Sequence, residues 1–132
     1  MIVLDANILV SAVLGQQTRR VLARAADGGV ALSVPEPQLV EAARVLVDKI
    51  GLSPEETAEA LDAVTNSVTP LALEFYNAQE SAARARLHAR GQPDWPVLAA
   101  ALAADGGVWS HDRDFFGVGV PVWSTPNMQF AD

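Results

Sequence analysis

The sequence contains no cysteine, only two histidines, His88 and His111, and a single lysine, Lys49. The lack of cysteine excludes disulfides, thiolate-bound zinc and thiol nucleophiles. Lysine and arginine together number 9 against 16 aspartates and glutamates, so the net charge is -7. Nonspecific affinity for nucleic acid comes mainly from cations that neutralise phosphates. Any binding of nucleic acid must therefore depend on a local part of the surface.

The sequence also lacks a basic leader and a long apolar run. Asp5 and Asn7 interrupt the first apolar stretch well short of a signal peptide or a membrane span. We therefore expect a cytoplasmic protein with no membrane association. The chain has 132 residues, 50% of them hydrophobic, which suits a single domain over residues 1–132 that hides roughly two-thirds of its unfolded surface.

Short apolar runs predict strands, and apolar residues at helical spacing predict helices. The predicted strands cover residues 2–4, 30–34, 68–71, 108–110 and 120–123. The predicted helices cover residues 18–27, 37–50, 54–66, 75–90 and 95–104, with Ser53 and Asp94 as N-caps of two of them. Pro70 lacks a backbone donor, which places its strand at a sheet edge. This alternation predicts an α/β fold with a parallel sheet covered on both faces, followed by a docked or mobile tail over residues 126–132.

Several carboxylates lie where the chain leaves predicted strands or enters predicted helices. They are Asp5, Glu41, Asp94 and Asp112, with Asp114 close behind. Taken singly, a turn, a helix dipole or an N-cap explains each of them. In an α/β sheet, however, the carboxyl ends of the strands form the ligand site, so these side chains would gather there.

Acids packed at this density repel one another, and a divalent cation relieves the repulsion. Mg²⁺ or Mn²⁺ fits oxygen-only ligands and can lower the pKa of a bound water so that it attacks phosphorus. The pattern therefore predicts metal-assisted hydrolysis of a phosphodiester. His111 is either a further ligand or base, or an ordinary loop residue. The arginines Arg84, Arg86 and Arg90 either guide phosphate or form a solvated helix face.

Four segments, in order along the chain, carry a resemblance to a known family. They are residues 2–7 (Ile-Val-Leu-Asp-Ala-Asn), 37–41, 94–99 (Asp-Trp-Pro-Val-Leu-Ala) and 109–115 (Trp-Ser-His-Asp-Arg-Asp-Phe). With these segments the chain resembles a PIN domain, and in particular the VapC-type toxin ribonucleases of toxin-antitoxin pairs. The resemblance implies a three-layer α/β/α sandwich with strand order 3-2-1-4-5. The first and fourth strands then lie side by side at the topological switch point.

The resemblance also implies roles for single residues. The catalytic and metal-binding quartet would be Asp5, Glu41, Asp94 and Asp112, with Asp114 as an auxiliary metal ligand, Asn7 orienting Asp5, and Ser110, where the family often has Thr, holding a water or a phosphate. The implied reaction is Mg²⁺- or Mn²⁺-dependent endonucleolytic cleavage of RNA that leaves a 5'-phosphate and a 3'-hydroxyl. The implied partner is a small antitoxin whose tail crosses the acidic groove, and a homodimer is a further option for assembly.

Three other interpretations compete. A receiver domain needs a lysine after its last strand, whereas Lys49 falls within a predicted helix. A haloacid dehalogenase-type phosphatase needs Asp-x-Asp after the first strand, whereas this chain has Asp5-Ala6-Asn7. The third alternative is an inactive PIN scaffold that binds RNA or a protein partner without cutting, and the completeness of the acidic set weighs against it.

Overall fold

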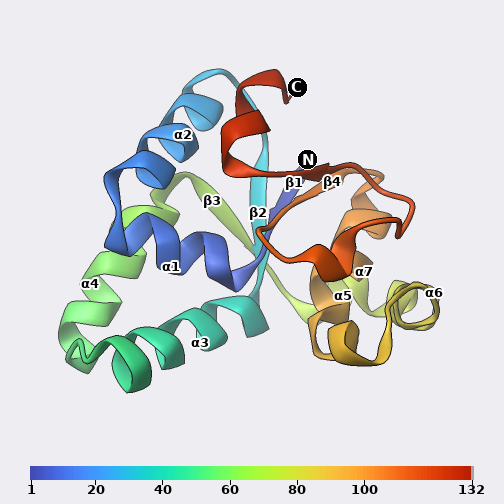
Figure 1. Cartoon of the computed structure of the whole chain (residues 1–132), viewed down its shortest axis with the longest axis horizontal. Coiled ribbons are helices and arrows are strands. Elements are labelled where there is room, and N and C mark those ends of the chain that lie inside the picture. Colours follow the sequence, from blue (N-terminus) through green and yellow to red (C-terminus); the bar gives the residue numbers. More distant parts are fainter. Residues whose placement is uncertain (132) are drawn as a thin grey trace.

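Five parallel strands form one sheet in the computed structural model, which describes residues 1–131 (Figure 1). The strands are β1 (Ile2–Leu4), β2 (Leu32–Pro35), β3 (Val68–Leu71), β4 (Gly107–Trp109) and β5 (Val122–Trp123). Their order is β3-β2-β1-β4-β5, and every neighbouring pair is parallel. The predicted fold class and strand order are therefore confirmed. Pro70 lies in β3, which is an edge strand as predicted.

Helices cover both faces of this sheet. They are α1 (Ala6–Leu14), α2 (Gln16–Asp27), α3 (Glu36–Val45), α4 (Pro54–Val64), α5 (Leu73–Tyr76), α6 (Glu80–Arg86) and α7 (Trp95–Ala104). Figure 1 shows α1 to α4 on one side of the sheet and α5 to α7 on the other. None of the helices within residues 1–131 is long and apolar enough to cross a membrane.

Successive residues of β1 point into two separate cores. Ile2 and Leu4 pack with α1 to α4, whereas Val3 packs with α7 and its neighbours. This two-sided burial explains why the strand is an uninterrupted apolar run. Helix α7 lies so deep that Val97 and Leu98 are both fully buried, which explains its apolar sequence without a polar face.

The helix boundaries after β2 follow the predicted signals. Helix α3 continues through a π-helical turn, Leu46–Ile50, and ends at Gly51, whose φ of 91° is in the left-handed region that favours glycine. Ser53 then caps α4: its hydroxyl accepts from the Glu56 N–H at 3.0 Å, and the Glu56 carboxylate accepts from the Ser53 N–H at 3.0 Å. Both predicted helices are confirmed.

The sequence pattern did not predict α1. Its inner face, with Ile8, Leu9 and Ala12, is buried, but the outer face is also largely apolar: Val10 is half-buried and Leu14 is exposed. Periodicity detects a helix only where apolar residues on one face alternate with polar residues on the other, so this segment gave no helical signal.

The single helix predicted over residues 75–90 is wrong. The structure has α5, a 3-10 turn (Asn77–Gln79), α6 and then a 3-10 segment, Ala89–Asp94. The chain leaves α6 at Leu87, which is extended and buries its side chain. The Gln92 amide donates to the carbonyls of Arg84 and Leu87 at 2.7 and 2.8 Å. The side chain of a residue shortly after α6 thus replaces the backbone donors that a continuing helix would supply.

The end of the chain packs against α2. Residues Thr125–Phe130 form a 3-10 helix whose Met128 is buried in the core beside α1 to α4. The sequence predicted a docked or mobile tail over residues 126–132. In the structure, this segment is docked against the domain as far as Ala131. Asp132 lies outside the described residues.

Candidate metal centre

The site begins where β1 and β4 end side by side. Leu4 pairs with Trp109 in the sheet, and the Asp5 N–H continues the ladder by donating to the Trp109 carbonyl at 3.1 Å. The residues that follow the two strands are therefore neighbours. The Ser110 hydroxyl donates to Asp5 Oδ2 at 2.8 Å, although 105 positions separate the two residues.

Asp5 is held by both of its carboxylate oxygens. Its Oδ1 accepts from the Ala6 N–H at 2.7 Å, which makes Asp5 the N-cap of α1, and the side chain is only 4% exposed. Burial raises the pKa of Asp5, and the charges of Asp112 and Glu41 add to this, whereas the bonds from Ser110 and Ala6 oppose it. Asp5 is thus a fixed carboxylate in a place that disfavours its own charge.

Asp112 is fixed by the turn after β4. Its Oδ1 accepts from the Asp114 N–H at 2.9 Å and so caps the short 3-10 helix Arg113–Phe115. Its own N–H donates to Ser110 Oγ at 2.9 Å. The Ser110 hydroxyl therefore connects the Asp5 carboxylate to the Asp112 backbone.

Asp94 comes from the other side of the cavity, at the end of the segment Ala89–Asp94. It stands at the predicted capping position of α7, but its side chain makes no capping hydrogen bond. Burial raises the pKa of Asp94 to about 7, and the charges of Asp5 and Asp112 contribute, followed by those of Glu41 and Asp114. The predicted N-cap role is thus wrong for the side chain.

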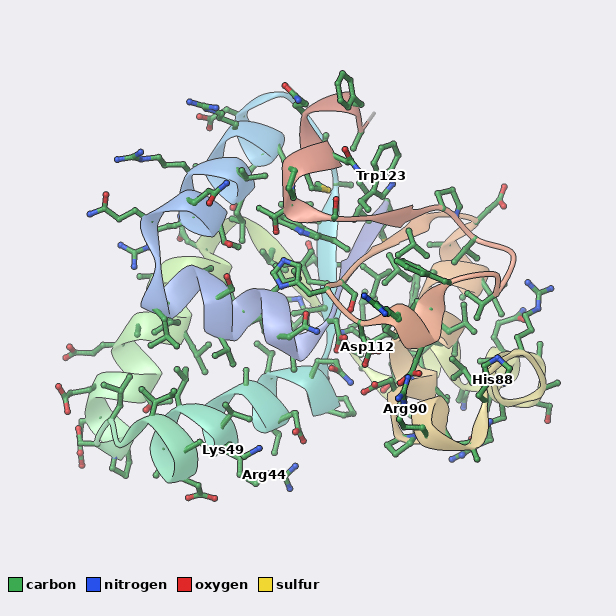
Figure 2. All side chains as sticks on the ribbon, viewed as in Figure 1. Arg44, Lys49, His88, Arg90, Asp112 and Trp123 are labelled. Atoms are coloured by element: carbon green, nitrogen blue, oxygen red, sulfur yellow. The ribbon has the colours of Figure 1, made fainter. Side chains whose placement is uncertain are left out.

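The three aspartates form one cluster. Asp5, Asp94 and Asp112 each offer a carboxylate oxygen, and these oxygens lie within 4.8 Å of one another. They line a cavity of about 260 Å³, which Asn7 and Glu41 also line. Figure 2 shows Asp112 in the region where the loop after β4 faces the start of α1. A set of carboxylate oxygens in which burial, together with the neighbouring charges, raises the pKa of Asp94 to about 7 is the donor chemistry that suits a hard divalent cation.

A comparison with known families agrees with this geometry. A family model described as PIN domain matches residues 3–132, nearly the whole chain. The chain belongs to the PIN-domain family. No curated protein matches it significantly. PIN domains are typically nucleases, and the acidic cluster gives this PIN domain a place suited to a metal ion.

Two of the sequence-predicted acids lie outside the cluster of this PIN domain. Glu41 lines the same cavity from α3, but its carboxylate is paired with Arg44 one turn further along and its side chain is 44% exposed. Asp114 is bound by Arg90, with 2.7 Å between Nη2 and Oδ1. The hydrogen bonds from Arg90 hold the pKa of Asp114 below its usual value. Among residues 1–131, only Asp5, Asp94 and Asp112 are brought together as candidate ligands.

The predicted supporting residues contact the cluster through Ser110. Asn7 Nδ2 donates to Ser110 Oγ at 3.5 Å, and Asn7 Oδ1 accepts from the His111 N–H at 3.4 Å. The His111 ring is turned toward Thr125, with 2.8 Å between Nε2 and the threonine Oγ1. His111 thus connects the loop after β4 to the C-terminal segment.

One polar residue of the site was missed by the sequence analysis. Gln38, on α3, is 4% exposed, and its Oε1 accepts from the Ala6 N–H at 3.0 Å. This bond ties α3 to the start of α1, beside Asp5. The available signal was its spacing: Gln38 precedes Glu41 by three positions, so both occupy one face of α3.

Replacing Ser110 with alanine should weaken Mn²⁺ binding to the PIN domain by about 10- to 100-fold, which is typical when a group that orients metal ligands is removed. The reason is that the same hydroxyl contacts Asp5 and Asp112. Titration calorimetry measures the effect. The matched control is Ser33→Ala in β2, because the buried Ser33 hydroxyl has no hydrogen-bond partner within residues 1–131. An equal loss in both variants would contradict an orienting role for Ser110.

Proposed function

We propose that this PIN domain is a divalent-metal-dependent endoribonuclease, with Mg²⁺ or Mn²⁺ as its cofactor. The observation that carries the proposal is the meeting of three carboxylate oxygens within 4.8 Å, from residues far apart in the sequence. In this proposal Asp5, Asp94 and Asp112 hold the cation, and Glu41 faces the reaction from the rim of the cavity. When bound, the cation supplies Lewis-acid chemistry, polarising the phosphate and making water a stronger nucleophile.

The side chains of the site prepare this reaction before substrate arrives. The Ser110 and Ala6 donors fix both oxygens of Asp5, so their free lone pairs have a defined direction. Asp94 has a pKa of about 7 in the absence of a cation, so it releases its proton on binding one near neutral pH. Glu41 supplies the carboxylate that lines the cavity without belonging to the three-aspartate cluster. We assign it to orient the attacking water and accept its proton, once it separates from Arg44.

The expected reaction is cleavage of single-stranded or structured RNA to products with a 5'-phosphate and a 3'-hydroxyl. A labelled RNA incubated with the purified protein should be cut in the presence of Mg²⁺ or Mn²⁺ and remain intact with EDTA, because the acidic cluster has no chemistry of its own for this step. Gel analysis of the products, followed by phosphatase treatment of their 5' ends, measures both features. Tight RNA binding without any cutting in either metal would favour the alternative of an inactive PIN scaffold.

We further propose that the protein is the toxin of a toxin-antitoxin pair, acting in the cytoplasm and inhibited by a small antitoxin. The support is the resemblance of residues 2–7, 94–99 and 109–115 to VapC-type toxins. A single domain over residues 1–132 is part of the same proposal. In this role Asp114 serves as an auxiliary ligand only if it leaves Arg90, so we assign the metal to the three clustered aspartates first.

A further inference from the structure

The arginines near residues 84–90 do not form one charged face. Arg84 donates to the Glu80 carboxylate at 2.7 Å, and its guanidinium lies over the Trp95 ring at 5.3 Å. Arg86 donates to the Val118 carbonyl at 3.0 Å. The guanidinium groups of Arg84 and Arg86 are therefore already bound to other groups of the protein. Of the three arginines, Arg90 is the one that contacts a carboxylate next to the metal centre.

The guanidinium of Arg90 is hydrogen-bonded to Asp114 along one edge, and its other edge faces solvent. Its Nε and Nη2 donate to Asp114 Oδ1 at 3.1 and 2.7 Å. The Asp114 side chain is 9% exposed, whereas the Arg90 side chain is 80% exposed. A guanidinium has five N–H donors in one plane, so the donors on its outer edge, including those of Nη1, remain available. The buried carboxylate thus fixes the plane of an arginine that faces solvent.

This arginine lies near the acidic cavity, because its partner Asp114 contacts Asp112 in the cavity wall. Arg90 and Asp94 share the short segment Ala89–Asp94, and the N–H of Asp114 donates to Asp112 Oδ1 at 2.9 Å. Gly91 lets the segment approach: a Cβ there would lie 3.1 Å from the Cβ of Asp114. In the view of Figure 2, Arg90 lies next to Asp112, whereas Arg44 lies further away, by α3. The guanidinium is therefore connected through Asp114 to Asp112, and through its own backbone segment to Asp94.

We propose that Arg90 binds a phosphate of the RNA strand next to the one that is cut, and that Asp114 holds the guanidinium in place for it. This inference rests on the proposed ribonuclease function. A cavity lined by four carboxylates, on a protein of net charge -7, repels an approaching polyanion. A planar guanidinium fits phosphate oxygens, and one that is already held loses little rotamer freedom on binding.

The test compares two variants that both lack the buried carboxylate. Asp114→Asn keeps Arg90, and the double variant R90A/D114N removes it, so neither leaves a buried charge without its partner. We expect the double variant to bind a fluorescein-labelled single-stranded RNA about tenfold more weakly than Asp114→Asn, as measured by anisotropy with Ca²⁺ replacing Mg²⁺. The slope of log affinity against log salt should fall by about 0.7, the value for one phosphate contact on a single strand.

Two controls separate phosphate binding from a purely internal clamp. Arg20→Ala removes the same charge from α2, which contributes no residue to the cavity, and should change RNA affinity by less than about twofold. Mn²⁺ affinity, measured by calorimetry, should be the same in Asp114→Asn and R90A/D114N. In the wild-type background, Arg90→Lys should keep the salt slope but lose part of the affinity, because an ammonium keeps the charge without the planar fork.

The inference is overturned if the single and double variants bind RNA equally, or if RNA and Mn²⁺ affinity fall together in the double variant. Either result would mean that Arg90 only joins the segment Ala89–Asp94 to the segment Arg113–Phe115 and does not bind RNA. If the wild-type protein neither binds nor cuts RNA in the presence of metal, the proposed function fails as well. That outcome is distinct, since it is seen before any variant is compared.

Discussion

Asp5→Asn should abolish metal-dependent RNA cleavage, with a loss on the order of a thousandfold or more, while the fold is preserved. The substitution removes one of the three carboxylates that meet within 4.8 Å, and with it a negative charge that the cation needs. Asparagine has the same shape. Its carbonyl oxygen can still accept from the Ala6 N–H, and its amide can donate to Ser110 Oγ if that hydroxyl rotates. The loss therefore reports on the charge of the site and not on the helix cap.

Three measurements make this result decisive: initial rates of cleavage of a labelled RNA, Mn²⁺ affinity, and the midpoint of urea unfolding. The matched control is Asp62→Asn, the same chemical change on an exposed position of α4, which should leave all three unchanged. In the presence of EDTA at neutral pH, we expect Asp5→Asn to unfold at a urea concentration no lower than that of the wild type, because it removes a carboxylate whose ionisation is disfavoured by burial. Equal cleavage by wild type and Asp5→Asn would falsify the assignment of the active site to this cluster.

Sequence pattern was sufficient for the parts of the fold that a local rule governs. The run Ile2–Leu4 is apolar at every position because both faces of β1 are buried, and a strand of that kind is readable without knowledge of its partners. The Ser53 capping box and the left-handed Gly51 are likewise local signals. Helix α1 was missed because its outer face is apolar as well as its buried face, so the sequence has no amphipathic period to detect.

The convergence of the acids was also predictable, because it follows from topology. Asp5 and Asp112 follow adjacent parallel strands, so a doubly wound fold brings them together whatever their separation in sequence. The partners of individual side chains were not predictable. Asp114 and Arg90 lie 24 residues apart, on segments that no pattern pairs, and their contact decides that this aspartate faces a guanidinium and not the cluster.

The same limit explains the broken helix before Asp94. Local propensity favours one continuous helix through an Ala- and Arg-rich segment, and only the amide of Gln92 and the burial of Leu87 show why the chain turns away. The turn has a consequence for the site. It delivers Asp94 to the cavity with its side chain free of a capping bond, so the carboxylate can face Asp5 and Asp112.

The metal-free protein should lose stability as the pH rises from about 4 to about 7. The pKa of Asp94 is 3.8 as an isolated group and about 7 in the folded protein, where burial and neighbouring charges disfavour ionisation. Between these values the folded state holds a proton that the unfolded chain has released, so the free energy of unfolding decreases with pH. The full shift corresponds to about 4 kcal/mol, and solvent screening of this half-buried group reduces the expected change to about 2 kcal/mol. The raised pKa of Asp5 acts in the same direction.

Urea unfolding at pH 5 and pH 7.5, with EDTA and then with excess Mn²⁺, measures this dependence. Asp114 and Glu56 have lowered pKa values and act in the opposite direction, but only below their ordinary values of 3.8 and 4.5, which lie under the two pH values compared. Mn²⁺ at 100 times its Kd should add about 2.7 kcal/mol at pH 7.5 and less at pH 5, where protons compete for the carboxylates. Metal should therefore flatten or reverse the trend. Asp94→Asn should remove most of the pH dependence in EDTA, since it replaces the titrating carboxyl with a neutral group of the same shape. If Asp94→Asn keeps the full dependence, the ionisation of the half-buried Asp94 is not its source, and the argument that its raised pKa favours a cation at this site fails.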